Sequence, residues 1–282
     1  MGNVYVTSHL DGDLDALKNI LEKLEFSQDD DIYIIGGIFS AKNKPVSGII
    51  DYIRLRNNIH YIPNEMDAIY RNFCLASSMV KNNINPTFYE EKKLYYKEMI
   101  KKKCGPKYAD HITLINKKNE KDEYLNWNFL RKLKEEQIVY VNGNLYLLTA
   151  GAPVKDEKDK NELLYKRTTE VPKNKKYFIT TEDGICIDFV TTDPEYQCMK
   201  DELDELNQRS ATIISASVPT YRLLNPTKEG KQMPIIDLGH IIYINTGNDI
   251  IEDTCGYKKG LSVVDLTNNK VFYFANSHFV PI

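Results

Sequence analysis

Side chains of the types that bind metal ions follow two short apolar segments of this chain. His9 and Asp11 come after the first segment, and Asn64 and Glu65 come after the second. An imidazole and a carboxylate are a sensible ligand pair for one divalent ion such as Zn²⁺ or Mn²⁺. These four residues are therefore the first whose chemistry needs to be weighed.

Each of these residues also has a structural explanation. Asp11 and Asp13 flank the start of a predicted helix, where aspartate is a common N-cap, and both interpretations stay open there. For His9 we favour a partly buried, hydrogen-bonded histidine over a ligand. For Glu65 we favour a solvated loop residue. Gly37 follows a strand and is expected to form a turn.

Strands and helices alternate through the first 63 residues. Residues 3–7, 31–36 and 60–62 are predicted strands, and residues 46–57 are a predicted helix. The other helix opens at Asp13 and carries apolar residues at helical spacing: Leu14, Leu17, Ile20, Leu21 and Leu24. Such an alternation predicts a mainly parallel sheet, with the loops after the strands gathered along one edge.

The middle of the chain is predicted to be a charged helical insertion, and the remainder to be rich in strands. Residues 67–136 form this cap, solvated on most sides, because the segment 89–97 has little continuous apolar face. Asn142-Gly143 and Asp183-Gly184 predict hairpin turns. Asp193-Pro194 predicts a helix start. No linker divides the chain, so residues 1–282 are predicted to form one domain that contains the cap.

The order of these segments resembles the calcineurin-like metallophosphoesterases, in the branch of Ser/Thr protein phosphatases and diadenosine tetraphosphatases. His-Leu-Asp-Gly-Asp-Leu at 9–14 is similar to the family motif Asp-x-His-Gly-Asp-Leu, with two ligand types exchanged. The four further family motifs match residues 36–42, 63–66, 147–151 and 216–219. The resemblance implies a four-layer α/β/β/α sandwich of two mixed sheets with a helical cap insertion.

The resemblance also implies that most metal-binding positions are altered. In the family these positions hold two metal ions; here they fall on His9, Asp11, Gly37, Asn64, Thr149 and Ser217, with Glu65 at the general-acid position. Gly37 has no side chain to bridge two ions, and the neutral hydroxyls of Thr149 and Ser217 are poor ligands. We expect no metal cofactor. His9, Asp11 and Asn64 could at most hold one weakly bound Mn, Zn or Mg ion.

Three functions follow from this pattern. The leading hypothesis is a catalytically inactive pseudophosphatase that acts as a binding or regulatory scaffold for an unknown protein partner or phosphorylated ligand. An alternative is a divergent metal-dependent phosphoesterase, a phosphatase or nucleotide hydrolase, with a reduced metal site. A second alternative is a module that binds a phosphorylated ligand without hydrolysis. The replacement of the family's phosphate-holding Arg by Ala41 argues against this alternative.

Composition and the lack of certain motifs argue against several other classes of function. The chain has 37 Lys and Arg against 40 Asp and Glu, so no global field favours nucleic acid or an anionic membrane. The five cysteines lack CxxC spacing and fit a reducing compartment, so we expect a cytoplasmic protein. No apolar stretch is long enough to span a membrane. The sequence also lacks a Walker loop, a GxGxxG turn and a GxSxG elbow.

Overall fold

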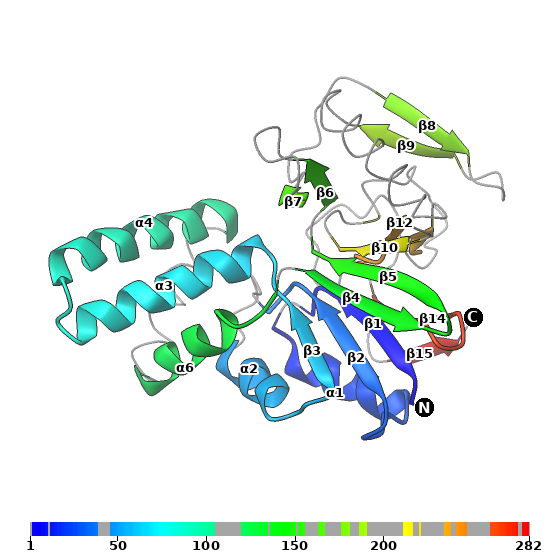
Figure 1. Ribbon diagram of the computed structural model, residues 1–282, viewed down its shortest axis with the longest axis horizontal. Helices are drawn as coiled ribbons and strands as arrows, with labels where there is room; N and C mark the ends of the chain where they lie inside the picture. The colour runs from blue at the N-terminus through cyan, green and yellow to red at the C-terminus, as the bar shows by residue number, and fades with distance from the viewer. Residues whose placement is uncertain are drawn as a thin grey trace.

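The computed structural model describes two mixed β-sheets that pack face to face, with helices over the outer face of the larger sheet (Figure 1). The residues described are 2–10, 12–38, 46–104, 120–134, 136–150, 152–155, 163–166, 176–180, 186–190, 211–216, 220, 234–237, 241–246, 260–275 and 278–281.

The larger sheet has six strands in the order β15-β14-β13-β1-β2-β3. Their bounds are Val4–Ser8 (β1), Asp31–Ile35 (β2), Ile59–Ile62 (β3), Leu261–Asp265 (β13), Lys270–Ala275 (β14) and His278–Pro281 (β15). Strands β1, β2 and β3 are parallel, which confirms the predicted β-α-β-α-β alternation. The remaining three strands are added antiparallel beside β1.

Two helices make the crossovers between the parallel strands. They are α1 (Leu14–Lys23) and α2 (Val46–Arg54). The Asp13 carboxylate accepts a hydrogen bond from the Ala16 amide at 3.0 Å, so Asp13 is the N-cap that its position predicted. The helical spacing in α1 buries Leu17, Ile20 and Leu21 against the sheet, while its other face meets solvent.

The smaller sheet has five strands in the order β11-β12-β10-β5-β4. Their bounds are Glu136–Val141 (β4), Asn144–Thr149 (β5), Ala211–Ser215 (β10), Ile236–Asp237 (β11) and Ile241–Tyr243 (β12). Asn142 and Gly143 join β4 to β5 with φ of 50° and 83°, the positive values that a type I′ turn requires. This confirms the predicted hairpin.

Two further hairpins are described by their strand pairs alone. One pairs β6 (Ala152–Lys155) with β7 (Leu163–Lys166), and the other pairs β8 (Lys176–Thr180) with β9 (Cys186–Val190). The second pairing matches the hairpin that Asp183-Gly184 predicted, although the turn itself and the helix predicted at Asp193 lie outside the described residues.

Two apolar cores hold the layers together. The first lies between the helices and the larger sheet, and the second fills the space between the two sheets, where Val6 and Ile35 meet Leu148 and Ile214. Because strand side chains alternate, the opposite face of the smaller sheet carries Leu147 and Ile213, which are buried as well. On the same face, Ile138 and Tyr140 of β4 are 62% and 74% exposed, so this face is buried at its centre and exposed along its β4 edge.

Three helices of unequal burial lie in or overlap the described part of the region 67–136. They are α3 (Glu65–Lys81), α4 (Pro86–Cys104) and α6 (Glu120–Leu130). α3 and α6 add Ile69, Phe73 and Leu130 to the first core. α4 packs along α3 and exposes much of its surface (Figure 1). A cap with boundaries at 67 and 136 stays a prediction.

Candidate functional site

His9 connects the two sheets at the edge where β1 and β2 end. Its backbone amide donates to the Ile35 carbonyl at 3.3 Å, and its ring Nε2 lies 3.2 Å from the Ala216 carbonyl oxygen, which follows β10. A carbonyl can only accept, so Nε2 carries the proton in this contact. His9 is thus the partly buried, hydrogen-bonded histidine that the sequence favoured, with one ring nitrogen engaged in a structural bond.

Gly37 lies directly against the backbone of His9. Its φ is +83°, and a Cβ placed on it would lie 2.5 Å from the His9 Cα and 2.9 Å from the Leu10 nitrogen. Both contacts involve main-chain atoms, which cannot rotate aside as a side chain can. The Gly37 carbonyl also accepts a hydrogen bond from Gly12 at 3.0 Å. The space that a side chain of residue 37 would need is therefore filled by the loop that follows β1.

Asn64 uses its amide oxygen to cap a helix. Its Oδ1 accepts a hydrogen bond from the Asp67 amide at 3.1 Å, while Asp67 Oδ2 accepts one from the Asn64 amide at 2.7 Å. This reciprocal pair is a capping box at the start of α3. An amide binds a metal through its oxygen, and that oxygen already serves the helix. Asn64 also packs over Gly36, since a Cβ there would lie 2.8 Å from Nδ2.

Tyr61 and Asp67 belong to this corner of the molecule, and the sequence motifs indicated neither residue. The Tyr61 hydroxyl accepts from the Ile38 amide at 2.9 Å and donates to Asp67 Oδ2 at 2.5 Å. The buried Asp67 carboxylate thereby links the loop after β2 to the start of α3. The spacing Asn-x-x-Asp is a variant of the capping-box pattern and could have indicated the Asp67 contact. No local signal indicates the long-range Tyr61 contact.

Neutral polar groups occupy the neighbouring strand ends. Thr149 ends β5 and is fully buried, and its carbonyl accepts from the Ala216 amide at 3.2 Å. The hydroxyls of Ser8 and Ser262 both donate to the Ile244 carbonyl, at 3.0 and 2.9 Å. Asn245 Nδ2 donates at 3.3 Å to the Ala216 carbonyl, the same oxygen that His9 contacts. The Ser8 and Ser262 side chains of the larger sheet thus bond to main chain that follows β12 of the smaller sheet.

The described donor set does not fit a dinuclear metal centre. Such a centre needs a carboxylate shared between two ions roughly 3.5–4 Å apart. Position 37, where the sequence resemblance predicts this carboxylate, has neither a side chain nor the space for one. The described ranges contain no cluster of three or more His, Cys, Asp and Glu side chains. Asp11, Ala41 and Ser217 lie outside the described residues, and for Glu65 the structure describes only its place as the first residue of α3.

The ionisable side chains at the start of β2 are paired or buried. At the other end of β2, the His60 ring nitrogen lies 2.7 Å from the Asp31 carboxylate, and the ring stacks on Tyr33 at 4.5 Å. Burial, with a smaller effect from the Asp31 charge, raises the pKa of the Tyr33 hydroxyl. Both effects keep this tyrosine neutral near pH 7.

Among the helices that the structure describes, none combines the length and apolar character needed to cross a bilayer.

Comparison with known proteins yields similarity to solved structures alone. No family model and no curated protein matches the chain. The chain is similar to a structure described as a "putative diadenosine tetraphosphatase", with 13% identity and a TM-score of 0.47 over 99% of this chain and 93% of the other. It is also similar to a hypothetical protein from Pyrococcus horikoshii OT3, with 14% identity and a TM-score of 0.43 over 100% of this chain and 88% of the other. At these scores the similarity assigns neither a family nor an activity.

Proposed function

We propose that this chain is a pseudophosphatase, a phosphoesterase-like sandwich without hydrolytic chemistry that acts as a binding or regulatory scaffold. The observation that carries this proposal is the contact between Gly37 and the backbone of His9. A Cβ on residue 37 would lie 2.5 Å from the His9 Cα, so the position for a bridging carboxylate is closed as well as empty. Without that bridge, two ions have no shared protein ligand to activate a water molecule between them.

Two independent features support the same proposal. The Asn64 oxygen caps α3, and His9 Nε2 faces the Ala216 carbonyl, so two further ligand candidates are engaged in structural hydrogen bonds. Thr149 presents a buried neutral hydroxyl where the family would have an imidazole. A single replaced ligand leaves a weakened site, whereas these changes together leave no complete ligand set for two ions.

A scaffold needs a surface for its partner, and α4 offers one. Phe88, Leu94 and Tyr95 lie on this helix with exposed fractions of 45%, 54% and 57%. Large exposed apolar side chains grouped on one element are typical of protein–protein contact surfaces. We assign the partner contact to these exposed side chains of α4.

A paired measurement of metal content and hydrolysis tests the proposal. The wild-type chain is loaded with Mn²⁺, its bound metal is measured by mass spectrometry, and generic phosphate esters are assayed over a pH series. We expect less than one equivalent of metal and no turnover above background. Stoichiometric metal together with hydrolysis that is lost in His9→Ala would overturn the proposal in favour of a divergent phosphoesterase.

A further inference from the structure

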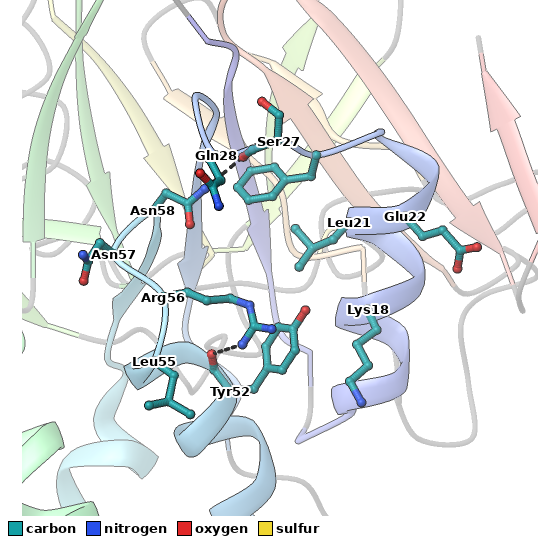
Figure 2. Close-up of a pocket in the computed structure, with 11 residues that line it drawn as sticks. Lys18, Leu21, Glu22, Ser27, Gln28, Tyr52, Leu55, Arg56, Asn57 and Asn58 are labelled. Carbon is teal, nitrogen blue, oxygen red and sulfur yellow. Dashed lines mark hydrogen bonds between the residues drawn. The ribbon is translucent and has the colours of Figure 1, made fainter.

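An open pocket lies at the opposite end of the larger sheet from His9. It has a volume of about 840 Å³ and is lined by the last turns of α1 and α2 and by the loops that lead into β2 and β3 (Figure 2). Volumes of 300–1,000 Å³ are typical of small-molecule sites. Because His9 and Gly37 follow strand ends while this pocket precedes strand starts, the two places are separated by the length of the strands.

Two cations in this pocket share one aromatic ring. The Arg56 guanidinium carbon lies 3.5 Å from the centroid of the Tyr52 ring, and the Lys18 ammonium lies 5.7 Å from the same centroid. Arg56 Nη1 also donates to the Tyr52 carbonyl at 3.0 Å, as Figure 2 shows. A stacked and hydrogen-bonded guanidinium is held in place before any ligand arrives, so it loses little freedom on binding.

Neither cation is neutralised by a carboxylate of the described part of the chain. No described carboxylate lies within 4.0 Å of Lys18 or Arg56, whereas the neighbouring Arg54 pairs with Asp51 at 2.8 Å. Glu22 is the one acidic side chain among the described lining residues, and in Figure 2 its carboxylate points away from Tyr52 and Arg56. The pocket therefore holds two positive charges that an anion could satisfy.

Hydrogen bonds fix the two loops that form the walls. Asn58 Nδ2 donates to the Ser27 carbonyl at 3.0 Å and to the Asp30 carbonyl at 2.9 Å, which joins one loop to the other. The Asp30 carboxylate accepts from the Asn3 amide at 2.6 Å and from the Ser27 amide and hydroxyl, both at 2.8 Å. The pocket is thus formed before a ligand binds, which lowers the entropic cost of binding.

We propose that this pocket binds a small organic phosphate. A phosphate monoester carries a charge of about −1.5 to −2 at pH 7, which matches the two cations. Arginine and lysine bind phosphate oxygens through charge-assisted hydrogen bonds. The pocket is larger than a bare phosphate needs, and Leu21, Phe26 and Leu55 line it with apolar surface for an organic body. This site is independent of the hydrolytic state of the His9 region.

Calorimetric titration of the full-length chain at low salt tests the ligand class. The probes are AMP, ribose 5-phosphate and phosphoserine, with adenosine and inorganic phosphate as the separated halves of AMP. We expect saturable binding of at least one organic phosphate, tighter than that of inorganic phosphate. Adenosine binding as tightly as AMP would overturn the role of the phosphate. No saturable binding by any organic phosphate would overturn the site.

Single substitutions locate the binding. Arg56→Gln and Lys18→Gln should each weaken the best probe about tenfold, because each removes one charge-assisted hydrogen bond. Arg54→Gln is the matched control, since Arg54 lies two positions before Arg56 in the chain and outside the pocket lining. The affinity of this variant for the probe should equal that of wild type. Glu22→Gln should leave affinity equal or modestly tighter, because it removes a negative charge.

Two outcomes would place the ligand elsewhere and overturn this assignment. One is an equal loss in Arg54→Gln and Arg56→Gln, which would indicate a general charge effect. The other is full binding in Arg56→Gln together with a loss of binding in His9→Ala. That result would place the phosphate near His9, at the opposite end of the strands from this pocket. Circular dichroism and thermal unfolding of each variant show that it is folded, and if Arg56→Gln is not, Lys18→Gln decides.

Discussion

Gly37 packs its α-carbon against the main chain of His9, with 2.5 Å between the His9 Cα and the position that a Cβ of residue 37 would take. Gly37, the second residue after β2, is thereby in contact with the residue that follows β1. The loop after β1 occupies the volume that a side chain of residue 37 would need, so any side chain there requires the backbone to shift.

Gly37→Ala should destabilise the protein more than Gly143→Ala. Both glycines have a φ of +83°, so both variants carry the strain of an alanine in the left-handed region, about 1 kcal/mol. Residue 143 has open space around its Cβ position, whereas residue 37 meets main-chain atoms. Urea unfolding should therefore give a loss of about 1 kcal/mol for Gly143→Ala and about 3 kcal/mol or more for Gly37→Ala. Equal losses would contradict the close contact.

Gly37→Asp should likewise fail to create a metal site. The new carboxylate would need space that the His9 loop fills, and Asn64 and Thr149 would still be unavailable or poor as ligands. Mass spectrometry after Mn²⁺ loading should show no additional bound metal relative to wild type, and phosphate-ester hydrolysis should stay at background. Turnover in this single variant would show that the loop can move aside.

Asp67→Ala should cost more stability than Asp13→Ala, although both aspartates hold a helix N-terminus. The Asp67 carboxylate is buried and accepts from the Asn64 amide and the Tyr61 hydroxyl, which would both lose their acceptor. Asp13 is partly exposed, and water can replace it at the Ala16 amide. We expect a loss of about 3 kcal/mol for Asp67→Ala and about 1 kcal/mol for Asp13→Ala from urea unfolding. Similar losses would show that the Tyr61 link contributes little.

Asp30 should contribute to stability at neutral pH and lose that contribution in acid. Burial raises the pKa of its carboxyl, but hydrogen bonds from the Ser27 and Asn3 backbone and from the Ser27 hydroxyl outweigh it, so the pKa lies below the ordinary 3.8. A carboxyl with a depressed folded-state pKa stabilises the fold above its unfolded-state pKa. This stabilisation disappears as pH falls through the folded-state value.

The difference in unfolding free energy between wild type and Asp30→Asn should therefore be largest near pH 6 and should narrow below about pH 4. Urea unfolding at a series of pH values measures it. Asp29→Asn is the control, because the exposed Asp29 side chain accepts no hydrogen bond from a described residue. A difference that is constant with pH would contradict the hydrogen-bonded role of Asp30.

Leu94→Ala and Ile100→Ala should separate the two faces of α4. Ile100 is 1% exposed and packs in the core beneath the larger sheet, while Leu94 on the same helix is 54% exposed. Thermal or urea unfolding should show a loss of about 2–4 kcal/mol for Ile100→Ala and of less than about 0.5 kcal/mol for Leu94→Ala. A large loss at Leu94 would mean that this face is covered within the same chain, which would remove it as a partner surface.

Local signals in the sequence were sufficient for the framework of the fold. The helical spacing after Asp13, the alternation of β1, α1, β2, α2 and β3, and the Asn142-Gly143 turn were all predicted and confirmed. Each depends on residues close together in the chain, through capping, periodicity or positive φ. The ordered motifs also led to the prediction of two mixed sheets, which the strand pairing confirms.

The chemistry of the candidate sites depends on contacts between distant residues, which only the folded structure decides. Residue type suggested that His9, Asp11 and Asn64 could hold one weak ion, yet the Ala216 carbonyl faces the His9 ring and Asp67 engages the Asn64 oxygen. The sequence around Gly37 did not indicate that the loop after β1 fills the volume a side chain there would need. Lys18 and Arg56, 38 positions apart, likewise meet over Tyr52 only because α1 and α2 pack side by side. Sequence determines which groups are present, but their availability depends on which atoms the tertiary fold brings within hydrogen-bond or van der Waals distance.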